Sequence, residues 1–167
     1  PKSFWLETLH NLLSEVGFSA EQYEPGSFRT PGNVAYPPDT QAAVIHDWID
    51  RDSNSYSSPE FSGQGLESSM EKELFFNRNL LSLSELLLVP GMTSERLSQI
   101  ARFVKVSPST GARSSSININ TVSPEVLRAM GFPDNFVNEY MEHRKIAPVT
   151  VQNISQNSQM FENQDLT

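Results

Sequence analysis

The chain has 167 residues, of which 37% are hydrophobic and 19% charged, and its 20 acidic and 12 basic residues give a formal net charge of −8. This composition is typical of a globular domain, and the acidic balance argues against nonspecific binding to nucleic acid or to an anionic membrane. The chain contains no cysteine, which excludes disulfides, thiolate metal sites, iron–sulfur clusters and cysteine nucleophiles. No run approaches the roughly 18 apolar residues of a membrane span.

Two helices are predicted in the first part of the chain. Apolar residues recur at helical spacing from Ser3 to Val16, and Gly17 can end this helix in the left-handed conformation. After a Pro/Gly-rich connection, a second helix is predicted to begin with Asp39 or Thr40 as its cap and to run through Ile49.

A long loop and two more helices are predicted next. The Ser-rich stretch 51–73 has no apolar period and is predicted to be a loop. Ser82 and Glu85 have the spacing of a capping box ahead of three leucines. Pro90-Gly91 should end that helix, and Thr93 should cap another one that continues to residue 104.

The last ordered part should contain a short extended piece at 117–119 and two helices. Ser123 is the predicted cap of the first, Pro124 fits its first position, and Gly131 fits its end. Asp134 should open the second, and the tail beyond it is rich in Gln and Asn and weakly patterned. The sequence therefore predicts a mainly α fold with long loops and little strand.

No catalytic pattern is present, and we predict that the protein is not an enzyme. His10, His46 and His143 have no acidic or serine partner at a recognisable spacing. The sequence has no nucleophile elbow, Walker loop or H-E-x-x-H. The G-x-G at 63–65 lacks the third glycine of a dinucleotide-binding fingerprint.

A cation site is one of two interpretations of the acidic run at 47–54. It concentrates carboxylates at a helix end and in the loop beyond it, and calcium prefers such oxygen ligands. Asp50, Asp52 and Asn54 fit the first three ligand positions of an EF-hand loop, but Ser55 stands where that loop requires Gly. From this spacing alone, a solvated acidic helix end is the favoured interpretation and a cation site remains the alternative.

Two segments have the pattern of a helix-hairpin-helix-like (SAM-like) unit. Each of the segments 86–92 and 127–132 contains a helix, a glycine hairpin and the start of a second helix. Versions that bind DNA bring hairpin amides to a phosphate, helped by a second glycine and by basic residues. Thr93 and Pro133 replace that second glycine here, and few basic residues lie nearby. Hairpins that pack protein are therefore favoured over hairpins that bind DNA.

An ordered set of phrases between Val44 and Pro148 resembles the minor pseudopilin K family of type II secretion (general secretion pathway protein K). The phrases are Asp47–Asp52 (DWIDRD), Gly65–Ser69 (GLESS), Asn77–Leu86 (NRNLLSLSEL), Val89–Met92 (VPGM) and Ile117–Thr121 (ININT). Their order and spacing agree with that family as well as their residues do.

The resemblance implies a non-enzymatic protein that assembles with the minor pseudopilins I and J, and with other type II secretion components, at the tip of the periplasmic pseudopilus. In this family a pilin-like α/β body carries an inserted helical domain and is anchored in the bacterial inner membrane by an N-terminal helix. We therefore expect a leading helix and connection at 1–43, the inserted helical domain at 44–150 and a weakly ordered return segment at 151–167, without the membrane helix. No nucleic-acid partner is expected. The alternative function is a DNA-binding module of the competence type.

Calcium is the cofactor that the resemblance implies. The family binds it near the loop after the D-W-I-D helix, and the residues here that match its ligands are Asp50, Asp52 and Glu67. Ser68 and Ser69 stand where the family has two further carboxylates. Because this exchange lowers the negative charge of the loop, it should weaken or abolish calcium binding.

Overall fold

A computed structural model describes residues 2–19, 35–70, 75–106 and 117–150 of the protein. The predictions for most of the Pro/Gly-rich connection, for the segment 107–116 and for the tail 151–167 lie outside the described residues. Helices dominate the described part, which contains one isolated bridge, between Ser58 and Phe61, and no longer strand. Its elements, with η for 3-10 helices, are α1 (Lys2–Glu15), α2 (Pro38–Ile49), η1 (Glu67–Ser69), η3 (Leu83–Leu88), α3 (Ser94–Ile100), α4 (Pro124–Ala129) and α5 (Asp134–Ile146).

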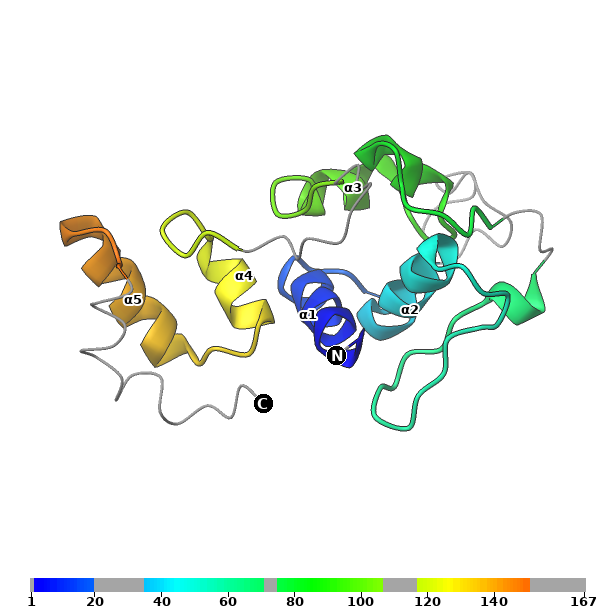
Figure 1. Cartoon of the computed structure of the whole chain (residues 1–167), viewed down its shortest axis with the longest axis horizontal. Coiled ribbons are helices and arrows are strands. Elements are labelled where there is room, and N and C mark those ends of the chain that lie inside the picture. The colour runs from blue at the N-terminus through cyan, green and yellow to red at the C-terminus, as the bar shows by residue number, and fades with distance from the viewer. Residues whose placement is uncertain (1, 20–34, 71–74, 107–116, 151–167) are drawn as a thin grey trace.

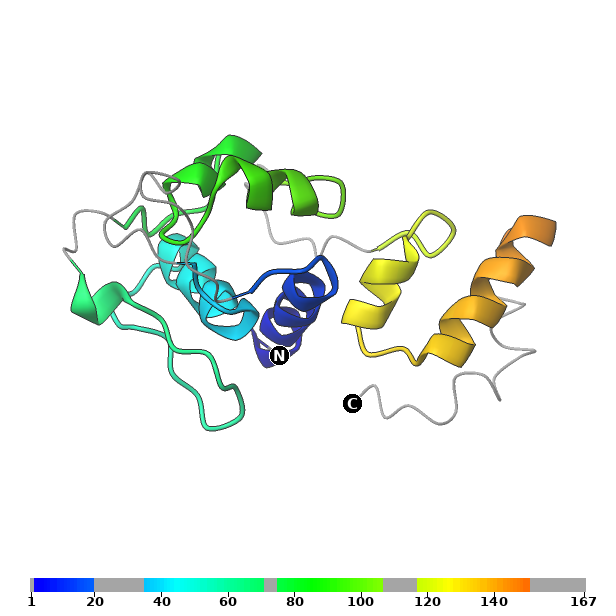
Figure 2. The ribbon, with the colours of Figure 1, turned by 180° about the vertical axis from the view of Figure 1, so that it is seen from behind.

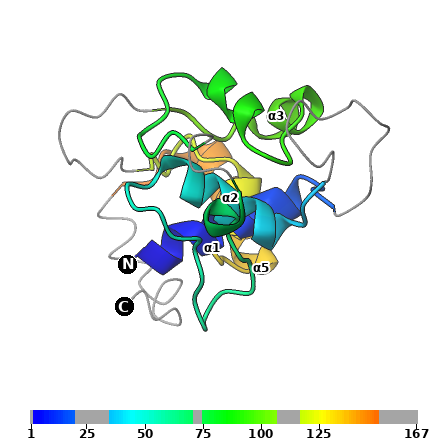
Figure 3. The same cartoon turned by 90° about the vertical axis from the view of Figure 1, so that its right-hand side faces the viewer.

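Helix α1 lies at the centre of the molecule. It packs against α2 on one side and α4 on the other, and α5 lies beyond α4 (Figures 1 and 2). The view turned by 90° also has α3 on one side of the α1–α2 pair (Figure 3). The helix covers the predicted range within one residue at each end, and Gly17 ends it with a φ of 89°. The expected boundary between residues 43 and 44 lies inside α2.

Two apolar clusters form the core. The larger one joins α1 and α2 to the segments around η3 and α3, with Leu13, Val44 and Val89 all fully buried. Trp48 of α2 is 4% exposed, and its ring lies 5.2 Å from the ring of Phe75 between centroids. The smaller cluster lies between α4 and α5. None of the helices in the described ranges combines the length and the apolar character that a membrane span needs.

The smaller cluster is closed by a turn where the sequence predicted an extended piece. The side chain of Asn118 accepts a hydrogen bond from the amide of Asn120, and this short-range bond favours a turn over a strand. Asn120 in turn exchanges two hydrogen bonds with the backbone of Val149, of 2.9 and 2.7 Å. Tyr140 of α5 donates its hydroxyl to the carbonyl of Ile119 at 2.7 Å. The turn before α4 is therefore bound both to α5 and to the segment that follows α5.

The predicted helix caps are confirmed at two positions. The Thr93 hydroxyl accepts the amide of Arg96 at 3.1 Å at the start of α3. The Ser123 hydroxyl accepts the amide of Val126 at 3.4 Å, with Pro124 at the first position of α4 as expected. These caps depend only on residues close in sequence, which is why the sequence predicts them.

The predicted capping box and the cap of α2 are wrong. Ser82 makes no side-chain cap, because the Glu85 carboxylate binds the guanidinium of Arg78 and the amide of Leu81, and the leucines after it form a 3-10 helix. Helix α2 begins at Pro38, and the Asp39 carboxylate accepts the hydroxyl of Ser62. In both cases the side chain binds groups other than the amides that a cap in the predicted position would hold.

Helix α3 is also shorter than predicted, because it ends at Ile100 instead of continuing to residue 104. Residues 101–103 form a turn in which the amide of Phe103 bonds the carbonyl of Ile100. This early end lets the segment after α3 turn along α1.

Arg96 of α3 is buried at 1% exposure and connects three parts of the fold. Its guanidinium donates to the Gln41 side chain at 3.0 Å, and to the backbone carbonyls of Gly91 at 2.9 Å and Tyr36 at 3.1 Å. The guanidinium also lies 4.5 Å from the ring centre of Phe18. Since the segment after α1, helix α2 and the Pro90-Gly91 turn all meet at this one side chain, Arg96 fixes how they pack.

Replacing Arg96 with methionine is expected to destabilise the protein strongly. The substitution Arg96→Met keeps most of the apolar volume but leaves several buried carbonyls without a donor, which should cost about 3 to 5 kcal/mol. Urea unfolding followed by circular dichroism measures this loss. Arg102→Met is the control, because the Arg102 side chain is 71% exposed and its pair with Glu125 is at the surface; its effect should stay within about 0.5 kcal/mol. Equal losses for the two variants would contradict the role given to Arg96.

Candidate metal centre

Asp47 in the last turn of α2 organises the loop that contains the predicted ligands. Its side chain is fully buried. One carboxylate oxygen accepts the amide of Tyr56 at 2.8 Å, and the other accepts the amide of Glu67 at 3.0 Å. Because these two amides belong to opposite arms of the loop 50–70, one buried carboxylate holds both arms against the helix. Ser62 binds the same loop to Asp39, near the start of α2.

The glycines of the G-x-G at 63–65 allow this close approach. A Cβ atom on Gly65 would lie 2.0 Å from the Asp47 carboxylate, and one on Gly63 would lie 2.1 Å from the carbonyl oxygen of Asp39. The Gly65 amide also donates to the carbonyl of Tyr56 at 2.9 Å. The G-x-G therefore serves contact between the loop and α2 in this structure.

The three predicted ligands Asp50, Asp52 and Glu67 come together in space. One carboxylate oxygen from each lies within 4.8 Å of the oxygens from the other two. Glu67 is fully buried, Asp50 is partly buried and Asp52 is exposed. A hard cation such as calcium binds where several carboxylate oxygens come together in this way.

Several oxygens of this cluster have no hydrogen-bond partner. They are Oε2 of Glu67, Oδ1 of Asp50 and Oδ1 of Asn77, and all three are buried. The other Glu67 oxygen accepts the side-chain amide of Asn77 at 2.9 Å. Buried oxygens without a donor are costly, and a bound cation removes that cost. The donor set therefore fits a cation that prefers oxygen ligands.

Asn77 is a cluster residue that the sequence analysis did not single out. It has a φ of 47°, a left-handed conformation that Asn tolerates better than most residues. This conformation turns the chain beside the loop and brings the amide to Glu67. The signal in the sequence was only its place at the start of the phrase 77–86, because contact with Glu67 depends on tertiary structure.

The two serines that replace carboxylates in the resembling pattern bind within the loop. Ser68 and Ser55 exchange reciprocal hydrogen bonds between hydroxyl and amide, of 2.9 and 2.7 Å. The Ser69 hydroxyl donates to the carbonyl of Leu66 at 2.8 Å. These bonds tie the loop arms together but add no negative charge, so the cluster has three carboxylates and one side-chain amide.

His46 borders the cluster, and the other two histidines belong to no group with metal-ligand spacing among the described residues. Its Nδ1 lies 3.1 Å from Asp50 Oδ2, and its ring packs on Tyr56. His46, Asp47 and Asp50 form a second group with metal-ligand spacing, but both Asp47 oxygens already accept backbone amides. His10 of α1 packs edge-on against Phe61, and His143 lies in the last turn of α5.

Burial and mutual repulsion raise the pKa values of two acids in the cluster. Loss of solvent is the largest cause for Glu67, whose pKa is raised further by the charges of Asp50, Asp47 and Asp52, although the hydrogen bond from Asn77 lowers it. Burial and then the charge of Asp52 raise the pKa of Asp50. The ionised cluster therefore opposes folding when no cation neutralises it.

The substitution Glu67→Gln should stabilise the metal-free protein at pH 7.5. Since the folded state raises the pKa of Glu67, it favours the protonated form, and ionisation of Glu67 at neutral pH costs stability. The advantage of the variant should shrink as the pH falls through the folded pKa and vanish below about 4.5, the ordinary value. Urea unfolding in the presence of a chelator, at several pH values, measures this difference.

Glu85→Gln is the matched control, with the opposite sign. Hydrogen bonds from Arg78 and from the amide of Leu81 lower the pKa of Glu85, so its ionised form contributes stability at neutral pH that is lost as the pH falls through the lowered pKa. This variant should therefore be less stable than the natural protein at pH 7.5. A Glu67→Gln variant that behaves in the same way would contradict the repulsion in the cluster.

No family model matches this chain, and no characterised protein matches it significantly. The interpretation of the acidic cluster therefore rests on its geometry and on the resemblance of the phrases given above.

Proposed function

We propose that this protein is a non-enzymatic assembly component of type II secretion, a minor pseudopilin of the K family at the tip of the periplasmic pseudopilus. The observation that carries the proposal is the convergence of Asp50, Asp52 and Glu67, which the resemblance implies as calcium ligands. They come from a helix end and from a distant part of a loop, and buried oxygens without donors lie among them. An acidic surface helix end does not require such a convergence.

Calcium is the cation that we propose for this cluster. Asp50, Asp52 and Glu67 would hold it. The side-chain NH₂ of Asn77 donates to Glu67, and the side-chain oxygen of Asn77 is buried without a hydrogen-bond partner. Bound there, the ion supplies the positive charge that neutralises the cluster. Because the three ligands come from the end of α2, from the loop after it and from η1, their neutralisation would stiffen the loop as a contact surface.

The proposal places this chain in the periplasm as the helical domain of a larger protein. In that protein a pilin-like α/β body carries the helical domain, and an N-terminal helix outside this chain anchors it in the inner membrane. Minor pseudopilins I and J would be its partners, together with other components of the secretion system. The mainly helical structure is compatible with this role.

Helix-hairpin-helix-like units are part of the proposal, with a role in packing rather than in binding DNA. Gly91 and Gly131, with φ values of 79° and 92°, each turn the chain between two helical elements. Pro90 and Met92 beside the first glycine are buried, and Arg96 binds the Gly91 carbonyl. A phosphate has little access to this first hairpin, which favours a packing role for it.

Calcium is expected to raise the melting temperature of the protein. At a calcium concentration about 100 times the dissociation constant, linkage gives about 2.7 kcal/mol, which for a domain of this size corresponds to about 5 to 10 °C. Thermal unfolding with about 5 mM calcium, against the same concentration of magnesium, measures the shift. Asp50→Ala should abolish it, whereas Glu60→Gln, at an exposed position of the same loop, should keep it. No shift with calcium in the natural protein sinks the calcium proposal.

Assembly is tested by mixing the protein with the minor pseudopilins I and J of the same bacterium. We expect one heteromeric peak in size-exclusion chromatography with light scattering, because association with these partners is the proposed function. The full-length protein without its membrane helix should be used, so that contacts made by the pilin-like body are included. Separate elution of all three proteins, together with a salt-sensitive shift of duplex DNA, would favour the DNA-binding alternative instead.

A further inference from the structure

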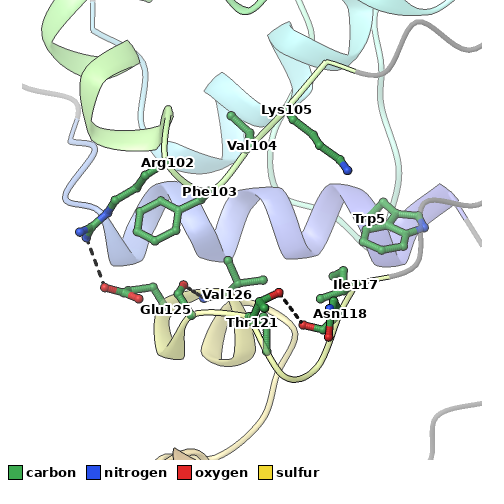
Figure 4. A pocket seen from close by; sticks show the side chains of 12 residues that line it. Trp5, Arg102, Phe103, Val104, Lys105, Ile117, Asn118, Thr121, Glu125 and Val126 are labelled. Atoms are coloured by element: carbon green, nitrogen blue, oxygen red, sulfur yellow. Dashed lines mark hydrogen bonds and ion pairs between the residues drawn. The ribbon is translucent and has the colours of Figure 1, made fainter.

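A second concave surface lies along α1, on residues that the acidic cluster does not use. It is a groove of about 670 Å³ between the segment that follows α3 and the turn that precedes α4, with α1 beside it (Figure 4). Phe103 and Val104 line one wall, and Ile117 and Val126 line the other. This volume is in the range of sites that hold several side chains of a ligand.

Trp5 gives the groove an exposed aromatic anchor at one end. Its side chain is 53% exposed, whereas Trp48, the other tryptophan of the chain, is 4% exposed. Figure 4 shows the indole at the end of the groove, beyond Ile117 and Asn118. Exposed tryptophan beside apolar walls is typical of surfaces where a partner buries aromatic area.

The charged residues of the groove select an acidic ligand. Lys105 is exposed and has no ion pair among the described residues, and its ammonium group extends across the groove in Figure 4. At the opposite end Arg102 pairs with Glu125 at 3.3 Å, and the Arg102 side chain is 71% exposed, so this surface pair is weak. In a chain of net charge −8, a groove with two cations and one carboxylate is a local positive site.

The wall formed by the turn before α4 has a polar side chain that can bind the backbone of an extended peptide. Asn118 uses its side-chain oxygen for the Asn120 amide, and its carbonyl accepts the Thr121 hydroxyl at 3.3 Å. Its side-chain NH₂ makes no hydrogen bond within the described part of the chain, which leaves two donors at the groove edge. Beyond the Arg102–Glu125 pair, a further hollow of about 540 Å³ continues between α1, α3 and α4, so the path is long enough for several residues.

We propose that this groove binds an extended acidic segment of a partner protein. One apolar side chain of the segment packs on Trp5, and a carboxylate beside it pairs with Lys105. A second apolar side chain packs near Phe103 at the other end of the groove. The Asn118 side chain donates to a carbonyl of the segment. The inference goes beyond the proposed assembly function, because it assigns a peptide site that shares no residue with the cation cluster.

Selection from a displayed library of random dodecapeptides tests this inference, with the natural protein as bait. The recovered peptides should contain Asp or Glu next to Leu, Met or an aromatic residue. Their binding, measured by fluorescence anisotropy, should weaken about tenfold in Lys105→Glu, the effect of about 1.4 kcal/mol for one lost charge pair. Lys145→Glu is the matched control, because Lys145 is an exposed lysine of α5 outside the groove, and it should bind as the natural protein does.

Tryptophan fluorescence supplies a second measurement with the same peptides. Emission should shift to shorter wavelength as Trp5 is covered, and this shift should be absent in Trp5→Phe, which keeps the buried Trp48. Recovery of no peptide, of peptides without acidic enrichment, or of peptides that bind Lys105→Glu and Lys145→Glu equally would overturn the inference. The inference would also be overturned if Lys105→Glu left peptide binding unchanged and instead weakened self-association or binding to vesicles with about 30% anionic lipid.

The test also separates this inference from the assembly proposal. If Lys105→Glu still forms the complex with pseudopilins I and J but no longer binds the peptides, the groove has a separate ligand. If the peptides bind and the complex with I and J never forms, the peptide site stands while the assembly proposal fails.

Discussion

The buried carboxylate of Asp47 is the constraint on which the loop, and with it the acidic cluster, depends. A charged group buried in the protein needs hydrogen bonds to offset its lost hydration, and Asp47 obtains them from the amides of Tyr56 and Glu67. This requirement fixes the path of a loop that has little regular secondary structure of its own. It also sets Gly65 against the carboxylate, where a Cβ atom has no room. The same arrangement brings Glu67 close to Asp50, so the fold concentrates negative charge that only protonation or a cation can relieve.

Local signals were predicted well from the sequence, because their partners lie within a few residues. The caps at Thr93 and Ser123 and the helix end at Gly17 follow from such short-range geometry. The roles of Asp47 and Asn77 were not predicted, since each depends on a chain segment that only the folded structure brings near. The cluster was anticipated through the resemblance of the phrases and not through spacing, which favoured a solvated helix end.

Two of the basic residues near the glycine hairpins are bound within the protein. Arg96 is enclosed by carbonyls and by the Gln41 side chain. Arg128 binds Glu15 of α1 at 2.9 Å and Asp134 of α5 at 2.7 Å, and so links three helices. These two arginines therefore link elements of the fold, whereas Arg102 and Lys105 stay exposed at the groove. Counting arginines in a sequence could not reveal this, because burial and ion pairing decide whether a cation is available to a ligand.

Helix α1 separates two surfaces that differ in chemistry. The acidic cluster is built on α2 and its loop, whereas the groove lies between α1, the segment after α3 and the turn before α4. The proposed cation would contact neither Lys105 nor Trp5, and the proposed peptide would contact none of the three carboxylates. Their shared support is the packing of α1 against both α2 and α4. If one surface influences the other, the effect must pass through that packing, because the two sites have no residue in common.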